Sequence, residues 1–187
     1  DRMSAMRRMA TLMGETEVVG VTTNAALLKA LCAHPAFVGG EVDTGFIERH
    51  RDSLFAKLQP ADDRALAVAT LARLVEWQTA TEIAAQSSAD RWSPWARQNA
   101  FRLLDEGHDE VRWKDGEHEV TVIARRRRAG GARLELPGGP RDAEVRRLEE
   151  DRLAIRLGED SFTASVVRRQ TSDGVDYTVF ADGASRR

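Results

Sequence analysis

The residues in this sequence that could carry chemistry are few and scattered. His34, His50, His108 and His118 fall in different predicted elements, without the close spacing that metal ligands share. Cys32 lies on a predicted helix face with leucines, which favours a buried structural thiol over a nucleophile. The phosphate-binding, dinucleotide-binding, zinc-protease and serine-hydrolase motifs are all absent from the sequence. We therefore expect no catalytic residue, no cofactor site and no metal site in this chain.

The residues best suited to recognition lie in a predicted loop at 87–100. Trp92 and Trp95 stand close together there, with Arg91 and Arg97 nearby. Tryptophan and arginine are the residue types most enriched at binding hot spots, so these four are candidate residues of a partner interface. The alternative is that both indoles close the end of a barrel.

The charge balance argues against a polyanionic partner. The chain has 28 basic and 30 acidic residues and a net charge of -2, and neither half is markedly basic. The run Arg125 to Arg128 is an exception, but successive side chains of a strand point to opposite faces, so a solvated strand end is favoured over a nucleic-acid site. We expect neither a nucleic-acid nor a membrane partner.

The compartment is predicted from what the sequence lacks. It has one cysteine, no run resembling a signal peptide and no apolar run of 18 residues. A reduced, cytoplasmic location is therefore the expectation.

Residues 1–50 predict a small helix, strand and helix unit. Methionines recur at helical spacing before Gly14, residues 17–21 predict a short apolar strand, and Thr23 or Asn24 can cap a helix that Pro35 ends. A unit with one strand cannot cover its own apolar faces, so it needs a sheet to belong to. Since Asp1 opens within a helical pattern, we expect the chain to be a piece of a larger protein.

Residues 61–86 predict one long helix, for which Asp62 and Asp63 provide the cap and complement the helix dipole. Its apolar residues spread around most of its circumference. A helix of this kind is buried on most sides.

Residues 101–183 predict eight short strands, because the hydrophobic period changes to two and turn dipeptides recur. Strands in this sequence suggest an up-and-down barrel or a strongly curled sheet. The predicted fold is α+β: an eight-stranded antiparallel barrel around the long central helix, preceded by the small α/β unit.

The first quarter of the chain resembles the C-terminal end of the biotin carboxylase domain of biotin-dependent carboxylases. The matching features are Arg8-Met9, the segment Gly20 to Asn24, His34-Pro35, and Asp43-Thr44 followed by Phe46-Ile47. The resemblance implies that residues 1–50 are a remnant of that domain.

Residues 51–187 resemble the BT domain that follows biotin carboxylase in acyl-CoA carboxylase α subunits. The segment from Asp43 to Asp52 resembles methylcrotonyl-CoA carboxylase α subunits more than propionyl-CoA ones, and acetyl-CoA, propionyl-CoA and geranyl-CoA stay open as substrates of the parent enzyme. The run from Asp90 to Trp95, followed by Phe101, resembles the family's passage from helix to barrel. The resemblance implies a barrel wrapped around a helix that docks the α subunit, with its biotin carboxylase and biotin carrier domains, to the carboxyltransferase β subunit.

The resemblance also implies what the chain lacks. The parent enzyme would be an ATP-dependent ligase that uses biotin, ATP and Mg or Mn, but biotin attachment needs a lysine between methionines. Lys29, Lys57 and Lys114 stand in LKA, AKL and WKD. We therefore expect a non-catalytic scaffold; the alternative is an independent barrel that binds a small molecule inside.

Overall fold

The computed structural model describes residues 1–55, 60–87, 107–127, 131–149, 151–181 and 184–186. The chain divides into two compact units. One comprises residues 1–59 with 180–185, and the other comprises residues 60–179 with 186–187.

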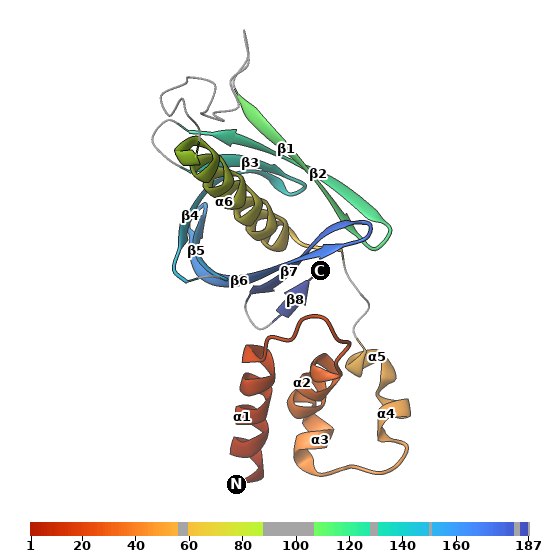
Figure 1. The fold of residues 1–187 in the computed structure, drawn as a ribbon. Helices are drawn as coiled ribbons and strands as arrows, with labels where there is room; N and C mark the ends of the chain where they lie inside the picture. The colour runs from red at the N-terminus through yellow and green to blue at the C-terminus, as the bar shows by residue number, and fades with distance from the viewer. Residues whose placement is uncertain (56–59, 88–106, 128–130, 150, 182–183, 187) are drawn as a thin grey trace. The chain divides into compact units, whose positions relative to one another are not determined.

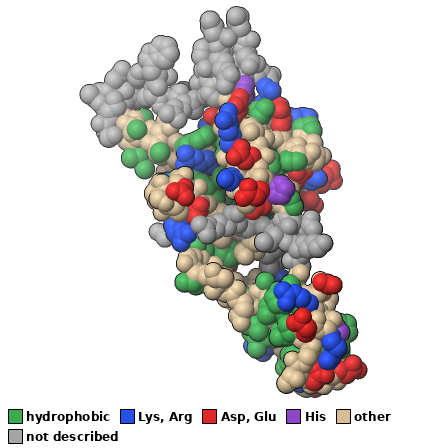
Figure 2. Space-filling view, turned by 90° about the vertical axis from the view of Figure 1, so that its right-hand side faces the viewer, with side chains coloured by type: hydrophobic (Ala, Val, Ile, Leu, Met, Phe, Trp, Pro, Cys, Tyr) green, Lys and Arg blue, Asp and Glu red, His purple; other side chains and the backbone are tan. Residues whose placement is uncertain are grey.

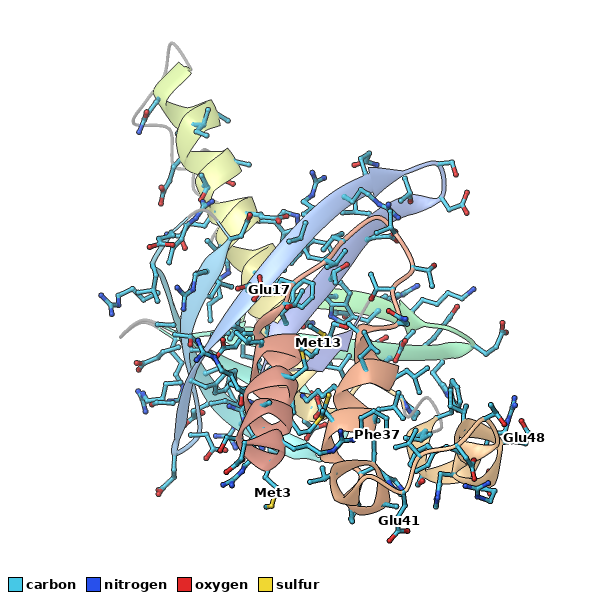
Figure 3. All side chains as sticks on the ribbon, turned by 90° about the horizontal axis from the view of Figure 1, so that it is seen from below. Met3, Met13, Glu17, Phe37, Glu41 and Glu48 are labelled. Atoms are coloured by element: carbon cyan, nitrogen blue, oxygen red, sulfur yellow. The ribbon has the colours of Figure 1, made fainter. Side chains whose placement is uncertain are left out.

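The described part of residues 1–59 is helical: α1 (Arg2–Glu15), α2 (Ala25–Ala33), α3 (Pro35–Gly39), α4 (Phe46–Arg49) and α5 (Arg51–Leu54). The Asp1 carboxylate caps α1 by accepting a hydrogen bond from the Ser4 amide at 2.8 Å. Arg2 joins α1 to α3, because its guanidinium donates to the carbonyl oxygens of Phe37 at 2.9 Å and Val38 at 3.2 Å. Figure 3 shows α1 and α2 side by side, with Met3 near the N-terminal end of α1.

The strand predicted at 17–21 is wrong: residues 16–24 contain neither helix nor strand. An isolated strand leaves its N–H and C=O groups without backbone partners, and the described part of this unit's first 59 residues offers no strand to pair with. One finer expectation also changes, because the Cys32 thiol is half-buried rather than buried.

The long helix is α6 (Asp63–Ser87), two residues later at its start and one at its end than predicted. The Asp62 carboxylate caps it, accepting from the Ala65 amide at 2.8 Å. Its first half is buried on all sides, as predicted, with Ala67, Val68 and Thr70 fully enclosed. Its second half is not: from Gln78 to Gln86 most side chains are exposed, and Figure 3 shows this end of the helix projecting beyond the strands.

The strands form one antiparallel sheet in sequence order, confirming a sheet built from successive hairpins. Seven strands have five residues or more and the last has three: β1 (His108–Asp115), β2 (His118–Arg126), β3 (Ala132–Leu136), β4 (Gly139–Arg147), β5 (Arg152–Leu157), β6 (Asp160–Thr171), β7 (Gly174–Ala181) and β8 (Ala184–Arg186). The first predicted strand, 101–106, lies outside the described residues, and β8 was not predicted. Figure 1 shows the sheet curled into an open half-barrel with α6 along its concave side.

The tight turns fall where the glycines predict them. In the β1–β2 and β5–β6 hairpins the register leaves two residues between the last paired positions, Asp115 with His118 and Leu157 with Asp160. Gly116 and Gly158 occupy the first turn position with φ values of 62° and 63°, a conformation that glycine adopts without a steric cost.

The N-terminal end of α6 is held by two turns of the sheet. The Gly138 amide donates to both carboxylate oxygens of Asp63, each at 3.1 Å, and the Ala61 amide donates to Asp115 Oδ2 at 2.8 Å. Asp63 therefore does not cap its own helix but binds the β3–β4 turn. These contacts fix where α6 begins relative to the sheet.

We predict that Gly138→Ala destabilises the fold. A Cβ at this position would overlap the Asp63 carboxylate, so the carboxylate must move and lose the bond from the Gly138 amide. Loss of a hydrogen bond to a charged group corresponds to about 1.5–3 kcal/mol, which urea unfolding of the 187-residue chain would measure. Gly39→Ala is the matched control, because nothing lies within 4 Å of its added Cβ. Equal stabilities of the two variants would contradict the prediction.

Candidate interaction surface

The predicted interface residues Arg91, Trp92, Trp95 and Arg97 all lie outside the described residues, within 88–106. The described element that precedes this segment is the second half of α6. The candidate surface therefore comprises that half of the helix and the strands that hold it.

The second half of α6 presents a mixed surface. Ile83 is 61% exposed, and Gln78 donates to Glu82 at 3.0 Å along the helix. The hydroxyls of Thr79 and Thr81 donate to helix carbonyl oxygens one turn back, at 2.9 and 2.8 Å. This part of the helix is thus available for contact with another molecule, while its first half is not.

A polar cluster stands where α6 leaves the apolar interior. The Tyr177 hydroxyl on β7 donates to Glu76 Oε2 at 2.5 Å, and Arg73 donates to the Tyr177 hydroxyl at 3.3 Å. The Glu76 carboxylate also lies 3.5 Å from Arg73 and 3.5 Å from Arg168 on β6. One carboxylate therefore joins the helix to two strands, and we call Arg73, Glu76, Arg168 and Tyr177 the Glu76 cluster.

The Glu76 cluster continues through an aromatic contact to the opposite end of the sheet. Trp113 on β1 packs edge-to-face on Tyr177 of β7, with ring centroids 5.2 Å apart, and donates from Nε1 to the Thr70 hydroxyl at 2.9 Å. Strand β1 is the first in the sheet order and β7 the seventh, so side chains bridge two strands that are far apart in that order. The curl of the half-barrel therefore brings a side chain of β1 into contact with one of β7.

Burial sets the electrostatics of Tyr177, which is 7% exposed. Burial raises its pKa above the usual value of 10.0, and the hydrogen bond to the Glu76 carboxylate raises it further, whereas the neighbouring Arg73 lowers it. The hydroxyl therefore stays protonated near neutral pH and remains a donor to Glu76.

The outward face of the sheet carries paired charges. Arg125 binds Glu135 at 2.9 Å, Arg127 binds Asp142 at 2.6 Å, and Glu144 and Arg156 pair between β4 and β5. Arg126 binds Asp109 at 2.8 Å, so each described arginine of the four-arginine run has an acidic partner; Arg128 lies outside the described residues. Figure 2 shows basic and acidic side chains interspersed on the visible face of this unit, without a single-sign patch.

Two of the histidines pack against an aromatic side chain. His34 and His50 flank the buried Phe46 ring, with centroids at 5.3 and 4.6 Å, which is a packing role. Within the described ranges, no three histidine, cysteine or acidic side chains gather as metal ligands would. None of the described helices is long and apolar enough to cross a membrane.

The Glu76 cluster was missed by the sequence reasoning. Glu76 and Tyr177 are 101 residues apart in the sequence, and Arg73 and Tyr177 are 104 residues apart. No local sequence pattern joins residues at such separations. A signal was present, however: Arg73 and Glu76 are the only charged residues between Ala65 and Trp77, in the apolar part of the helix, and partly buried charges need partners.

Comparison with known proteins assigns both parts of the chain. Residues 1–49 match the family model described as the biotin carboxylase C-terminal domain, and residues 62–187 match the model described as the methylcrotonyl-CoA carboxylase α-subunit BT domain.

The relatives are all much longer than this chain. A Dictyostelium discoideum protein named mitochondrial methylcrotonoyl-CoA carboxylase subunit alpha is 36% identical over 133 residues, which cover 71% of this chain and 18% of that protein. The Mus musculus protein of the same name is 22% identical over 136 residues, covering 73% of this chain and 19% of its own length. The Arabidopsis thaliana protein of that name is 31% identical over 99 residues, 53% of this chain and 13% of its own. The matched part of the chain spans between 13% and 19% of the length of these relatives.

We predict that the Tyr177 hydroxyl loses its proton at a higher pH than a free tyrosine does, and that this loss lowers the free energy of unfolding. Tyr177 is the single tyrosine of the chain, so the absorbance of tyrosinate reports it alone. Because its folded pKa is raised, its contribution to stability is complete below about pH 10, the unfolded pKa, and is lost as pH rises through the folded pKa. Glu76→Gln should lower the titration midpoint, since it removes the negative acceptor. A midpoint unchanged by that variant would contradict the contact.

Proposed function

Because this chain belongs to the family of methylcrotonyl-CoA carboxylase α-subunit BT domains, we propose that it is a non-catalytic scaffold that docks an α subunit to a carboxyltransferase β subunit. The parent enzyme would carboxylate biotin with ATP and bicarbonate at one site and transfer the carboxyl group to an acyl-CoA at the other. Methylcrotonyl-CoA is the acyl-CoA we propose, because the family and the relatives carry that name.

The observation that carries this proposal is a helix enclosed in its first half and exposed in its second. Ala67 and Val68 are fully buried, so α6 fills the space along the concave side of the sheet. The alternative function, a barrel that binds a small molecule, requires that same space. An interior occupied by the protein's own helix favours a structural role, with recognition on the outside.

We further propose that the sheet closes around α6 as an eight-stranded barrel in the assembled enzyme. The Trp113–Tyr177 contact supports closure, since it joins the first and seventh strands of the sheet across the helix. A closed barrel has no free edge strand to pair with other chains, which suits a domain that must dock by its loops and helix end.

The lysines of this chain do not fit the sequence pattern of biotin attachment. Lys29, Lys57 and Lys114 lack the flanking methionines that biotin attachment requires, so the carrier would be another domain. Biotin, ATP and Mg or Mn thus belong, in this proposal, to the parent enzyme. The division of the chain into a biotin carboxylase remnant at 1–50 and a BT domain at 51–187 is likewise our proposal.

The benefit of such a scaffold is proximity. A tethered biotin reaches a second active site as an intramolecular event, and its effective concentration depends on the span between the two sites. Docking would hold that span constant. We propose a reduced compartment for the enzyme; the relatives are named as mitochondrial, whereas the sequence alone suggested the cytoplasm.

The direct test is to mix the 187-residue chain with the β subunit encoded beside its gene. The mass of the complex is then measured by size-exclusion chromatography with light scattering. We expect a stable complex, since a specific interface of this type buries more than roughly 1,000 Å². Separate elution of the folded chain and the β subunit would contradict docking by this region.

We predict that Trp92→Ala or Trp95→Ala weakens this complex by about 2 kcal/mol or more if the indole is a hot spot. Isothermal titration of the β subunit with each variant gives the dissociation constant, and circular dichroism checks the fold. Leu148→Ala is the control, because Leu148 is a 41% exposed apolar residue outside the 87–100 loop. A double tryptophan variant that binds as tightly as the control would remove this loop from the interface.

A further inference from the structure

The direction of the exposed half of α6 must be fixed by a specific contact. A small tilt of the helix near Glu76 becomes a large displacement at its C-terminal end. A helix rises about 1.5 Å per residue, so Ser87 lies roughly 16 Å beyond Glu76, and a tilt of about 10° at Glu76 displaces that end by about 3 Å. A displacement of this size exceeds what a well-packed interface tolerates. The residues that set the tilt therefore matter to whatever the helix end contacts.

Apolar packing holds only the first half of α6. The buried side chains Leu66, Leu71 and Leu74 all precede Glu76, whereas from Gln78 onward most side chains are exposed. The Asp63 and Asp115 contacts hold the opposite end of the helix. Fixing the direction of a straight helix requires a second directional contact, far along the helix from the first.

The Glu76 cluster supplies that second contact at the right place. The Glu76 side chain contacts Tyr177 on β7 and Arg168 on β6. Among the described residues of α6, it is the one nearest the C-terminal end whose side chain forms a hydrogen bond or an ion pair with a strand. Its bond from Tyr177 is short, at 2.5 Å, and its acceptor is charged, which makes the contact both strong and directional. Trp113 packs on Tyr177 and holds the phenol ring in place.

We infer that Glu76 is a positioning residue: through its hydrogen bond from Tyr177 it fixes the direction of the exposed second half of α6 and so presents the exposed side chains of that half to the β subunit. The role of Glu76 in fixing the direction of α6 is inferred from these contacts alone. The effect of that direction on binding to the β subunit rests on the proposed function.

The role of Glu76 is tested by a distance that does not depend on any partner. Spin labels are attached at Gln86→Cys on the exposed helix end and Arg146→Cys on the exposed face of β4, with Cys32→Ser to remove the single native thiol. Pulsed electron paramagnetic resonance gives the distribution of distances between the labels. We expect one narrow distribution for the parent and a broadened or shifted one for Glu76→Ala and Tyr177→Phe.

Two control variants separate positioning from general stability. Val122→Ala removes fully buried apolar atoms from β2 without touching the cluster, so it should lower stability and leave the distribution narrow. Glu76→Gln keeps an acceptor for the Tyr177 hydroxyl and should restore the narrow distribution. Unchanged distributions in Glu76→Ala and Tyr177→Phe, or equal broadening in Val122→Ala, would overturn the inference.

The consequence for assembly is measured with the same variants and the β subunit. We expect Glu76→Ala to weaken binding about tenfold, equivalent to about 1.4 kcal/mol, with Val122→Ala close to the parent. A parent chain that does not bind the β subunit would overturn the proposed docking function, while the label distances would still decide the role of Glu76. Narrow distributions combined with normal binding in both cluster variants would overturn the inference and leave docking intact.

Discussion

Helix α6 and the curled sheet each carry apolar surface that the other must cover. The helix is apolar around its first half, and the concave face of the sheet contributes residues such as Val122, Ala124 and Leu134, all fully buried. Alanines on the helix keep its cylinder narrow, which lets the sheet wrap it closely. The tight turns, the strong curl and the anchored helix start all serve this enclosure.

The boundary of that enclosure is where polar chemistry becomes useful. Apolar burial stabilises many orientations almost equally, whereas a hydrogen bond between a phenol and a carboxylate specifies one. The Glu76 cluster lies at this boundary, half-buried, so its charges are partly solvated and its ion pairs contribute modestly to stability. Its value for a scaffold lies in geometry more than in free energy of folding.

Much of this architecture could be predicted from local sequence, and its failures have physical causes. The α6 cap at Asp62 and the hairpin glycines depend on neighbouring residues, and both were predicted correctly. The strand at 17–21 was wrong because a strand needs partners that local pattern cannot supply. The prediction that α6 is buried on most sides was wrong for its second half, because the apolar composition of a helix does not show how far the strands extend along it.

The candidate site was harder to predict for a related reason. Its tryptophans and arginines were chosen by residue type and lie within 88–106, so they stay a prediction. The cluster that holds the preceding helix joins residues about a hundred positions apart. Only the presence of Arg73 and Glu76 in an apolar helix hinted that distant partners must exist.

The sequence order of the sheet also bears on how this domain acquires its structure. Successive strands pair through short turns, so each hairpin can form early and independently, at a low cost in loop-closure entropy. The contacts between α6 and β7 close a loop of more than a hundred residues and depend on the strands between them. Folding would then proceed as a progressive wrapping of hairpins around the helix, with the Tyr177 contacts among the last to form.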